Sequence, residues 1–161
     1  ITAEDTASTL SPRLAELGGR LLVETIARLK AGTLVPQPQD SSQATMAPLL
    51  KKEDGIIDWT LPAAALANRV RGLAPWPGAY TAVPGGDRWT IWRAHALPGP
   101  VTKPPGAVVA VTNEAIHVAT REGVLALLEL QPANSRRMVV SQYLAGHPIA
   151  VGLQLGGPVP S

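Results

Sequence analysis

Apolar side chains recur every three or four positions near the start of the chain, the spacing of one stripe along an α-helix. The members of this stripe are Leu10, Leu14, Leu17, Leu21, Leu22, Ile26 and Leu29. Ser8 or Thr9 is suited to cap the first turn, and Gly32 is suited to close the last one. The pattern therefore predicts a helix over residues 9–31 whose apolar stripe needs a partner surface.

The chain then loses this period and becomes rich in proline and small polar residues over residues 33–54. Such a composition predicts an extended linker that ends in a charged turn. A short second helix follows, because Thr60 is suited to its cap, Pro62 to its first turn and residues 63–70 to its body.

A rigid corner follows the second helix. Gly72 is suited to end the helix with a positive φ, and the backbone on both sides of Trp76 is restricted by Pro75 and Pro77. Gly78 then relieves the crowding before the next strand. We interpret Trp76 as a core anchor that pins the helix to a sheet, in preference to a residue that stacks on a nucleotide base.

Five later stretches carry the alternating, β-branched or leucine-rich pattern of β-strands, with turn residues between them. They cover residues 80–83, 88–97, 106–111, 115–120 and 124–130. Five short antiparallel strands with a flanking helix predict a mainly β fold, a small OB-like barrel that is closed or partly open. A short helix over residues 139–145, stopped by Gly146, and a fraying tail complete the chain.

The strand over residues 88–97 presents different side chains on its two faces. Trp89, Ile91 and Arg93 point one way. Arg88, Thr90, Trp92 and Ala94 point the other way. This arrangement allows one tryptophan in the core and one exposed beside an arginine, where it could stack on a base. We favour a barrel that is packed on both sides.

Composition and charge narrow the function only in part. With 45% hydrophobic residues, the 161-residue chain can build a core, and its lack of cysteine excludes disulfides and thiolate metal sites. That lack agrees with a reducing cytoplasm, bacterial or organellar. The N-terminus has no signal-peptide pattern, and no apolar run approaches a membrane span. Residues 1–50 contain four basic and five acidic residues, and residues 51–161 contain ten basic and seven acidic ones. The positive charge of the second part is compatible with a polyanionic partner.

None of the familiar catalytic signatures occurs in the chain. There is no Gly-x-Ser-x-Gly elbow, no phosphate-binding P-loop and no dinucleotide fingerprint. The three histidines, His95, His117 and His147, lack the spacing of a metal-ligand motif. We therefore interpret them as surface or cross-strand residues and expect neither a catalytic residue nor a metal site.

Three motifs carry a resemblance to a known family. They are Asp54-Gly55-Ile56-Ile57-Asp58-Trp59, Asn68-Arg69-Val70-Arg71-Gly72 and Pro75-Trp76-Pro77-Gly78-Ala79-Tyr80. They resemble the formyltransferases that use 10-formyltetrahydrofolate, and the resemblance covers nearly the whole chain, from Ile1 to about Leu155. The corner is shared with sugar-nucleotide formyltransferases. The stretch from Leu127 to Ala133, followed by Arg136-Arg137-Met138, is more similar to the methionyl-tRNA formyltransferase family.

The resemblance implies an enzyme that transfers a formyl group from 10-formyltetrahydrofolate to the amino group of methionyl-initiator tRNA in translation initiation. It places the folate site and the catalytic Asn, His and Asp before residue 1, so this chain alone is expected to be inactive and to hold no cofactor. Residues 1–32 would be the C-terminal helix of a truncated, Rossmann-like catalytic domain. Residues 33–54 would be a linker, residues 55–155 an OB-like tRNA-binding domain and residues 156–161 a tail.

The same resemblance implies that basic residues hold the backbone of the tRNA. The candidates are Lys51, Lys52, Arg69, Arg71, Arg136 and Arg137, with Arg88 and Arg93 as weaker ones. The two lysines have a competing role in a solvated turn neutralised by Glu53 and Asp54, and the arginines of the second helix could pair with these acids or with Asp58. Residues 136 and 137 have no acid beside them in the sequence, which favours a phosphate contact.

Two other functions stay open. One is the C-terminal structural domain of a sugar-nucleotide formyltransferase, which would not contact RNA. The other is a structural or oligomerisation module, suggested by the apolar stripe of residues 9–31, which could pack on a second copy of the chain. The sequence does not determine the oligomeric state.

Overall fold

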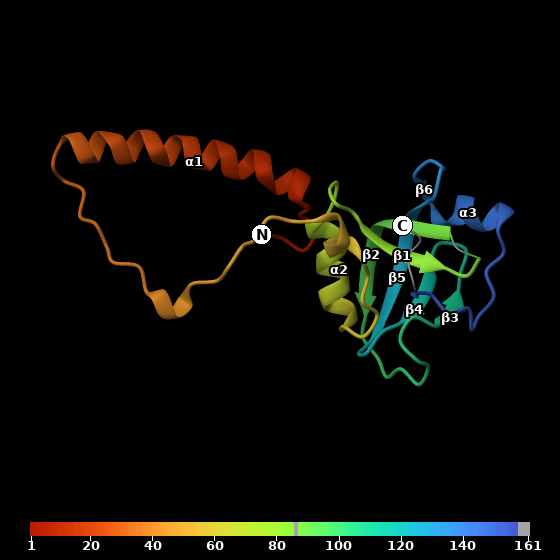
Figure 1. The fold of residues 1–161 in the computed structure, drawn as a ribbon. Coiled ribbons are helices and arrows are strands. Elements are labelled where there is room, and N and C mark those ends of the chain that lie inside the picture. Colours follow the sequence, from red (N-terminus) through yellow and green to blue (C-terminus); the bar gives the residue numbers. More distant parts are fainter. Residues whose placement is uncertain (86, 158–161) are drawn as a thin grey trace. The chain divides into compact units, whose positions relative to one another are not determined.

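The computed structural model describes residues 1–85 and 87–157 and divides into two compact units, residues 1–50 and residues 51–161 (Figure 1). The first unit holds the predicted long helix, α1 (Ala7–Lys30), and a 3-10 turn, η1 (Ser41–Gln43). The second unit holds all of the strands and the remaining helices. Its first element is a second 3-10 turn, η2 (Lys52–Gly55).

The N-terminal cap of α1 differs from the prediction. Thr6, rather than Ser8 or Thr9, is the cap: the Thr9 N–H donates to Thr6 Oγ1 at 3.2 Å, and the Thr6 N–H donates to Thr9 Oγ1 at 2.9 Å. This reciprocal pair satisfies two backbone donors, so the helix begins two residues before the predicted start. Gly32 has a φ of +69° and closes the helix as predicted.

The apolar stripe of α1 is exposed. Leu14, Leu21 and Leu29 keep 54%, 59% and 64% of their surface, and no residue of the helix is buried. The expected partner surface for this stripe therefore stays a prediction. None of the described helices is long and apolar enough to cross a lipid bilayer.

The second unit is built on one antiparallel sheet in the order β1-β2-β5-β4-β3, with a short β6 paired to β5. Its strands are β1 (Ala79–Val83), β2 (Asp87–Leu97), β3 (Val108–Val111), β4 (Ile116–Ala119), β5 (Val124–Pro132) and β6 (Met138–Val139). The five predicted strands are confirmed. The sequence missed β6, because two residues are too few to show a period. The predicted barrel is not confirmed, because the sheet is not closed: β1 and β3, at its two ends, do not pair within the described chain.

Two helices flank this sheet (Figure 1). The first, α2 (Ala63–Gly72), packs mainly against β2, and the second, α3 (Val140–Gly146), packs against β5 and β6. One buried cluster joins both helices to the inner face of the sheet. It includes Trp59, Leu66, Val70, Trp89, Ile91, Leu125, Leu127, Leu130, Val140 and Tyr143. The rings of Trp89 and Tyr143 meet edge to face, with centroids 5.3 Å apart, and so fix α3 on β2.

Both ends of α2 differ from the prediction. Thr60 does not cap the helix, because its hydroxyl and N–H donate to Asp58 Oδ1 at 2.6 and 3.0 Å. Instead the Ala63 N–H donates to the Glu122 carbonyl at 2.9 Å, so the β4–β5 turn satisfies a donor that a side-chain cap would have taken. Gly72 is the last helical residue and does not have a positive φ, since Leu73 ends the helix in a right-handed conformation.

A bulge in β2 changes its inward and outward pattern. Trp89 and Ile91 are buried as predicted, but the register with β5 shifts on either side of Arg93. The extra residue turns Ala94 into the core and Arg93 to the exposed side, opposite Glu129. The predicted directions of residues 93 and 94 were therefore wrong, while those of residues 88–92 agree with the burial pattern.

The corner holds its tryptophan at the surface. Trp76 keeps 59% of its surface exposed, so its predicted role as a core anchor was wrong. The turn between α2 and β1 is closed by the Gly78 N–H, which donates to the Leu73 carbonyl at 2.9 Å, and Gly78 has a φ of +78°. The peptide bonds before Pro75 and Pro77 are both cis.

Trp59 is the tryptophan that anchors this region. It keeps only 5% of its surface, and its Nε1–H donates to Thr81 Oγ1 of β1 at 3.0 Å. A Cβ added to Gly156 would lie 3.0 Å from the Trp59 ring, and the Gly156 N–H donates to the Ala82 carbonyl at 3.0 Å. The start of the predicted tail is thus tied to β1. Its last four residues, 158–161, lie outside the described residues.

Replacing each of the two tryptophans should affect stability to a very different extent. Trp59→Ala would remove a buried ring and leave the Thr81 hydroxyl without its partner, so the free energy of unfolding should fall by about 3–5 kcal/mol. Trp76→Ala should change it by no more than about 0.5 kcal/mol. Urea unfolding followed by circular dichroism measures both values. A loss for Trp76→Ala as large as for Trp59→Ala would contradict the assignment of Trp59 as the anchor.

Candidate nucleic-acid interface

Two arginines of the second unit lie over aromatic rings, one of β1 and one of β2. On the outer face of β2, Arg88, Thr90 and Trp92 are half-buried and alternate with the buried Trp89 and Ile91. The Arg88 guanidinium lies 4.9 Å from the centroid of the Tyr80 ring of β1, and the Arg137 guanidinium lies 4.9 Å from the centroid of the Trp92 ring. A cation over an aromatic face is held in place while part of its edge stays open to solvent.

The η2 turn places two lysines beside the first of these pairs. The Tyr80 hydroxyl donates to the Lys52 carbonyl at 3.2 Å, so the ring under Arg88 also holds the backbone of η2. The Asp54 carboxylate accepts from the Lys51 backbone N–H at 2.6 Å. Within residues 1–85 and 87–157, no ion pair joins the ammonium of either lysine to a carboxylate. Both side chains are exposed. Glu53 and Asp54 are adjacent in the same turn but form no direct ion pair with either lysine within the described residues.

Arg69 and Arg71 of α2 have partners on the protein. Arg69 Nη2 donates to the backbone carbonyl of Asp54, which ties the end of α2 to η2. Arg71 Nη2 donates to Asn68 Oδ1 at 2.6 Å, one turn back along the helix. Of the expected acidic competitors, Asp58 is affected by the charge of Arg69, which adds to the Thr60 hydrogen bonds that lower its pKa, while the hydrogen bond of Arg69 goes to a carbonyl. We assign Arg69 to the support of the η2 turn.

Arg136 and Arg137 follow β5 in a loop and differ in their surroundings. Arg137 donates from Nε and Nη2 to the two carboxylate oxygens of Glu129, at 2.7 and 2.8 Å. No acid adjoins this pair in the sequence, but Arg137 gains one in the fold, because the pairing of β5 with β6 returns the chain to Glu129, eight residues earlier. Arg136 is exposed and has no ion pair within the described part of the chain.

Charge supports the pairing of Glu129 with Arg137. Hydrogen bonds from Arg137 are the main cause that lowers the pKa of Glu129, and the positive charges of Arg137 and Arg93 add to it. The same hydrogen bonds raise the pKa of Arg137. The Glu129 side chain keeps 20% of its surface and that of Arg137 keeps 51%, so the ion pair is partly shielded from water. At neutral pH both groups are charged.

Lys51, Lys52, Arg88 and Arg136 have no ion pair within the described residues. Their segments are linked by backbone and ring contacts: the Lys52 carbonyl accepts from the Tyr80 hydroxyl, Arg88 lies over the Tyr80 ring, and the Arg88 carbonyl accepts from the N–H of Ala133, in the loop of Arg136, at 2.9 Å. We call Lys51, Lys52, Arg88 and Arg136 the cationic face. Sequence reasoning ranked Arg88 low and missed Tyr80 and Glu129. The alternation of β2 places Arg88 and Trp92 on one face. The position of Glu129 next to Arg137 depends on how β5 pairs with its neighbours, which the sequence does not show.

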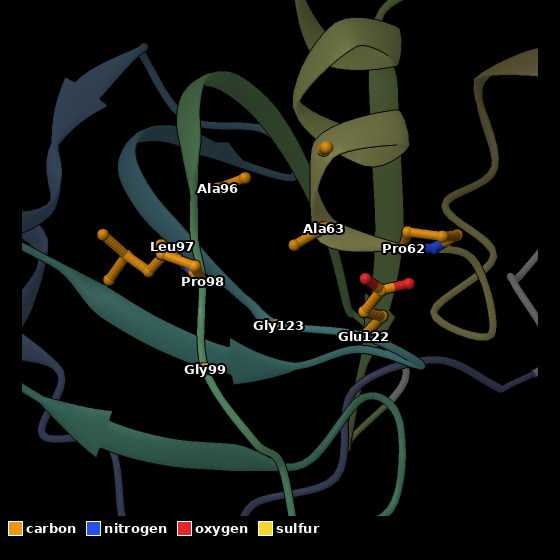
Figure 2. Close-up of a pocket in the computed structure, with 9 residues that line it drawn as sticks. Pro62, Ala63, Ala96, Leu97, Pro98, Gly99, Glu122 and Gly123 are labelled. Atoms are coloured by element: carbon orange, nitrogen blue, oxygen red, sulfur yellow. The ribbon is translucent and has the colours of Figure 1, made fainter.

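The remaining features of this unit lie apart from the cationic face. A pocket of about 300 Å³ is lined by small and proline side chains from the start of α2, the end of β2 and the β4–β5 turn (Figure 2). Its only titratable lining residue is Glu122.

His95 and His117 flank Ala126 across β5, as expected of cross-strand residues. Within the described residues, no group of three or more His, Asp and Glu side chains could hold a metal ion.

Comparison with known proteins shows which family this chain belongs to. The model of the formyl transferase C-terminal domain matches residues 49–148, which covers η2, the whole sheet and α3. The chain belongs to this family. The match includes every residue of the cationic face.

Relatives of the chain extend beyond this domain. It is 47% identical over 156 residues to the methionyl-tRNA formyltransferase of Solibacter usitatus, covering 97% of this chain and 49% of that protein. It is 43% identical over 155 residues to that of Trichlorobacter lovleyi and 41% identical over 157 residues to that of Bacillus subtilis, again covering 96% and 97% of this chain. The chain spans about half the length of these relatives, 48% and 49% in the last two cases.

Solved structures share the fold at lower identity. A variant of HypX from Aquifex aeolicus matches with a TM-score of 0.58 and 21% identity, covering 89% of this chain and 26% of that one. HypX in complex with tetrahydrofolic acid matches with a TM-score of 0.51 and 22% identity, covering 76% of this chain and 22% of that one. At this identity, the similarity shows a shared fold.

The ion pair of Glu129 with Arg137 predicts a pH-dependent stability. Because the folded pKa of Glu129 lies below its ordinary value of about 4.3, the contribution is fully present above that value and is lost as the pH falls through the folded pKa. The difference in free energy of unfolding between the native chain and Glu129→Gln should stay constant from about pH 7 to pH 5.5 and shrink below that.

Urea unfolding of both proteins at a series of pH values measures this difference. Glu114→Gln is a suitable control, because Glu114 is exposed in the turn between β3 and β4 and its carboxylate has no ion pair within the described residues. A difference for Glu129→Gln that is the same at about pH 3 and pH 7 would show that the ion pair does not contribute to stability.

Proposed function

We propose that this chain is the tRNA-holding half of a methionyl-tRNA formyltransferase. Its family membership and the names of relatives at 41–47% identity support this proposal over a sugar-nucleotide enzyme. The observation that carries it is the cationic face. Four basic side chains on connected turns and strands of the second unit, without carboxylate partners in the described residues, suit a domain that binds a polyanion.

The proposed role is positioning rather than sequence readout. Contacts from lysine and arginine to phosphates fix the orientation of an RNA but carry little sequence information. The cationic face would hold the backbone of initiator methionyl-tRNA, so that its acceptor end reaches the catalytic residues of the intact enzyme. There the formyl group would pass from 10-formyltetrahydrofolate to the methionyl amino group. In this proposal the chain itself binds neither the folate nor any other cofactor and works in the cytoplasm.

The basic residues would then contribute to tRNA binding in different ways. Lys51, Lys52, Arg88 and Arg136 would contact phosphates directly. Arg69 would act through η2, since it holds the Asp54 carbonyl and keeps the lysine turn against α2. Arg93 and Arg137 share the charge of Glu129, which lowers their net attraction for phosphate.

Salt dependence of tRNA binding tests this assignment. Each direct phosphate contact that is lost should lower the affinity for initiator tRNA and flatten the slope of log affinity against log salt by about one unit. We expect this result for Lys52→Ala and for Arg88→Ala, measured by filter binding between about 50 and 200 mM salt.

Lys103→Ala is the matched control. Lys103 is also exposed but lies in the loop after β2, at the end of that strand opposite to Arg88. Its removal should leave the slope unchanged, whereas an equal effect of all three substitutions would indicate non-specific attraction to net positive charge. Absence of tRNA binding by the native chain would refute the proposed function.

A second prediction follows from the proposal that this chain binds the tRNA while another part of the enzyme transfers the formyl group. The chain alone should not formylate methionyl-tRNA when supplied with 10-formyltetrahydrofolate, because the residues that the family resemblance identifies as catalytic are not among its own. Acid-gel separation of formylated from unformylated methionyl-tRNA measures this directly. Formylation above the rate of a reaction without protein would contradict the proposal that the chemistry takes place on another part of the enzyme.

A further inference from the structure

The loop that carries Arg136 is held by hydrogen bonds on both sides of that residue. On the N-terminal side, the Ser135 carbonyl accepts from Gln131 Nε2 at 2.8 Å, and the Ser135 N–H donates to the Pro132 carbonyl at 3.2 Å. On the C-terminal side, Arg137 is bound to both carboxylate oxygens of Glu129. Arg136 is exposed between these two anchored neighbours.

Trp92 connects the two anchors. Its Nε1–H donates to Gln131 Oε1 at 3.1 Å, which orients the amide so that its NH₂ group faces the Ser135 carbonyl. Its ring lies under the Arg137 guanidinium. The β2 bulge, which shifts the register next to Trp92, aims this one side chain at both partners.

We propose that Trp92, Gln131, Glu129 and Arg137 form a clamp that presents Arg136 as a preordered phosphate contact, and that Arg137 is a positioning residue rather than an RNA contact. This inference rests on the proposed function. The clamp gives the loop its order before binding, so less conformational entropy is lost when Arg136 meets a phosphate. The assignment also explains why an arginine on an RNA-facing loop is paired with a carboxylate: the pair holds the backbone.

A charge-matched substitution separates the clamp from a direct contact. Glu129→Gln together with Arg137→Gln removes the ion pair and leaves the net charge of the chain unchanged. If Arg137 acts through Arg136, this double variant should weaken tRNA binding by roughly two- to tenfold, the cost of ordering one or two side chains. In an Arg136→Ala background it should have no further effect on affinity, because the residue that it positions is gone.

The competing role predicts a different result. If Arg137 contacts a phosphate itself, the double variant should weaken binding equally in both backgrounds and flatten the salt slope by about one further unit beyond Arg136→Ala. That outcome would overturn the clamp. Trp92→Phe keeps the ring under Arg137 but removes the N–H that orients Gln131, so it should give a smaller loss that also depends on Arg136.

A readout without RNA tests the clamp independently of the proposed function. Amide hydrogen exchange of residues 133–137 in the full chain should be faster in the Glu129→Gln, Arg137→Gln variant than in the native chain, while exchange in β4 stays the same. Unchanged exchange in the loop would overturn the clamp even if tRNA binding is confirmed. Faster exchange with no tRNA binding by the native chain would instead refute the proposed function and, with it, the role of Arg136.

Discussion

The antiparallel pairing of β2 with β5, with its bulge beside Trp92, is the constraint on which the rest of the second unit depends. Up to the bulge it places Trp89 and Ile91 inside, and beyond the bulge it turns Ala94 inside in place of Arg93. Leu125, Leu127 and Leu130 of β5 supply the other half of the buried cluster. The two helices then cover this core. A shift of the register by one residue would exchange the faces and expose the core to water.

The same pairing organises the outer face. It brings Glu129 and Gln131 of β5 next to Arg93, Thr90 and Trp92 of β2, and so decides which arginines are neutralised. Arg137 is paired with Glu129, whereas Arg88 lies on Tyr80 without a carboxylate partner in the described residues, and for that reason we propose Arg88 as a phosphate contact. Basic residues that look equivalent along the chain therefore receive different roles from their neighbours across the strands.

Membership in the formyl transferase C-terminal domain family and this distribution of charge point to the same division of labour. In the function proposed for this chain, the sheet presents preordered cations, and short turns such as η2 and the loop of Arg136 carry them. Rigid presentation suits a surface that must orient a large RNA by its backbone, because each contact formed then costs little further ordering. It also accounts for the hydrogen bonds that fix these turns from behind, through Arg69, Tyr80 and Gln131.

The sequence by itself determined the local elements and the family. The stripe of α1, the body of α2 and the five longer strands follow from periods of 3.6 and 2 residues, which depend only on near neighbours. Tertiary structure alone decided which tryptophan is buried, where β2 bulges, that the sheet stays open and which acid faces Arg137. Trp76 and Trp59 both lie near turns, and Trp59 is buried among residues distant in the chain, Thr81 and Gly156 among them. Such pairings bring together residues far apart in the sequence, and no local pattern encodes their register.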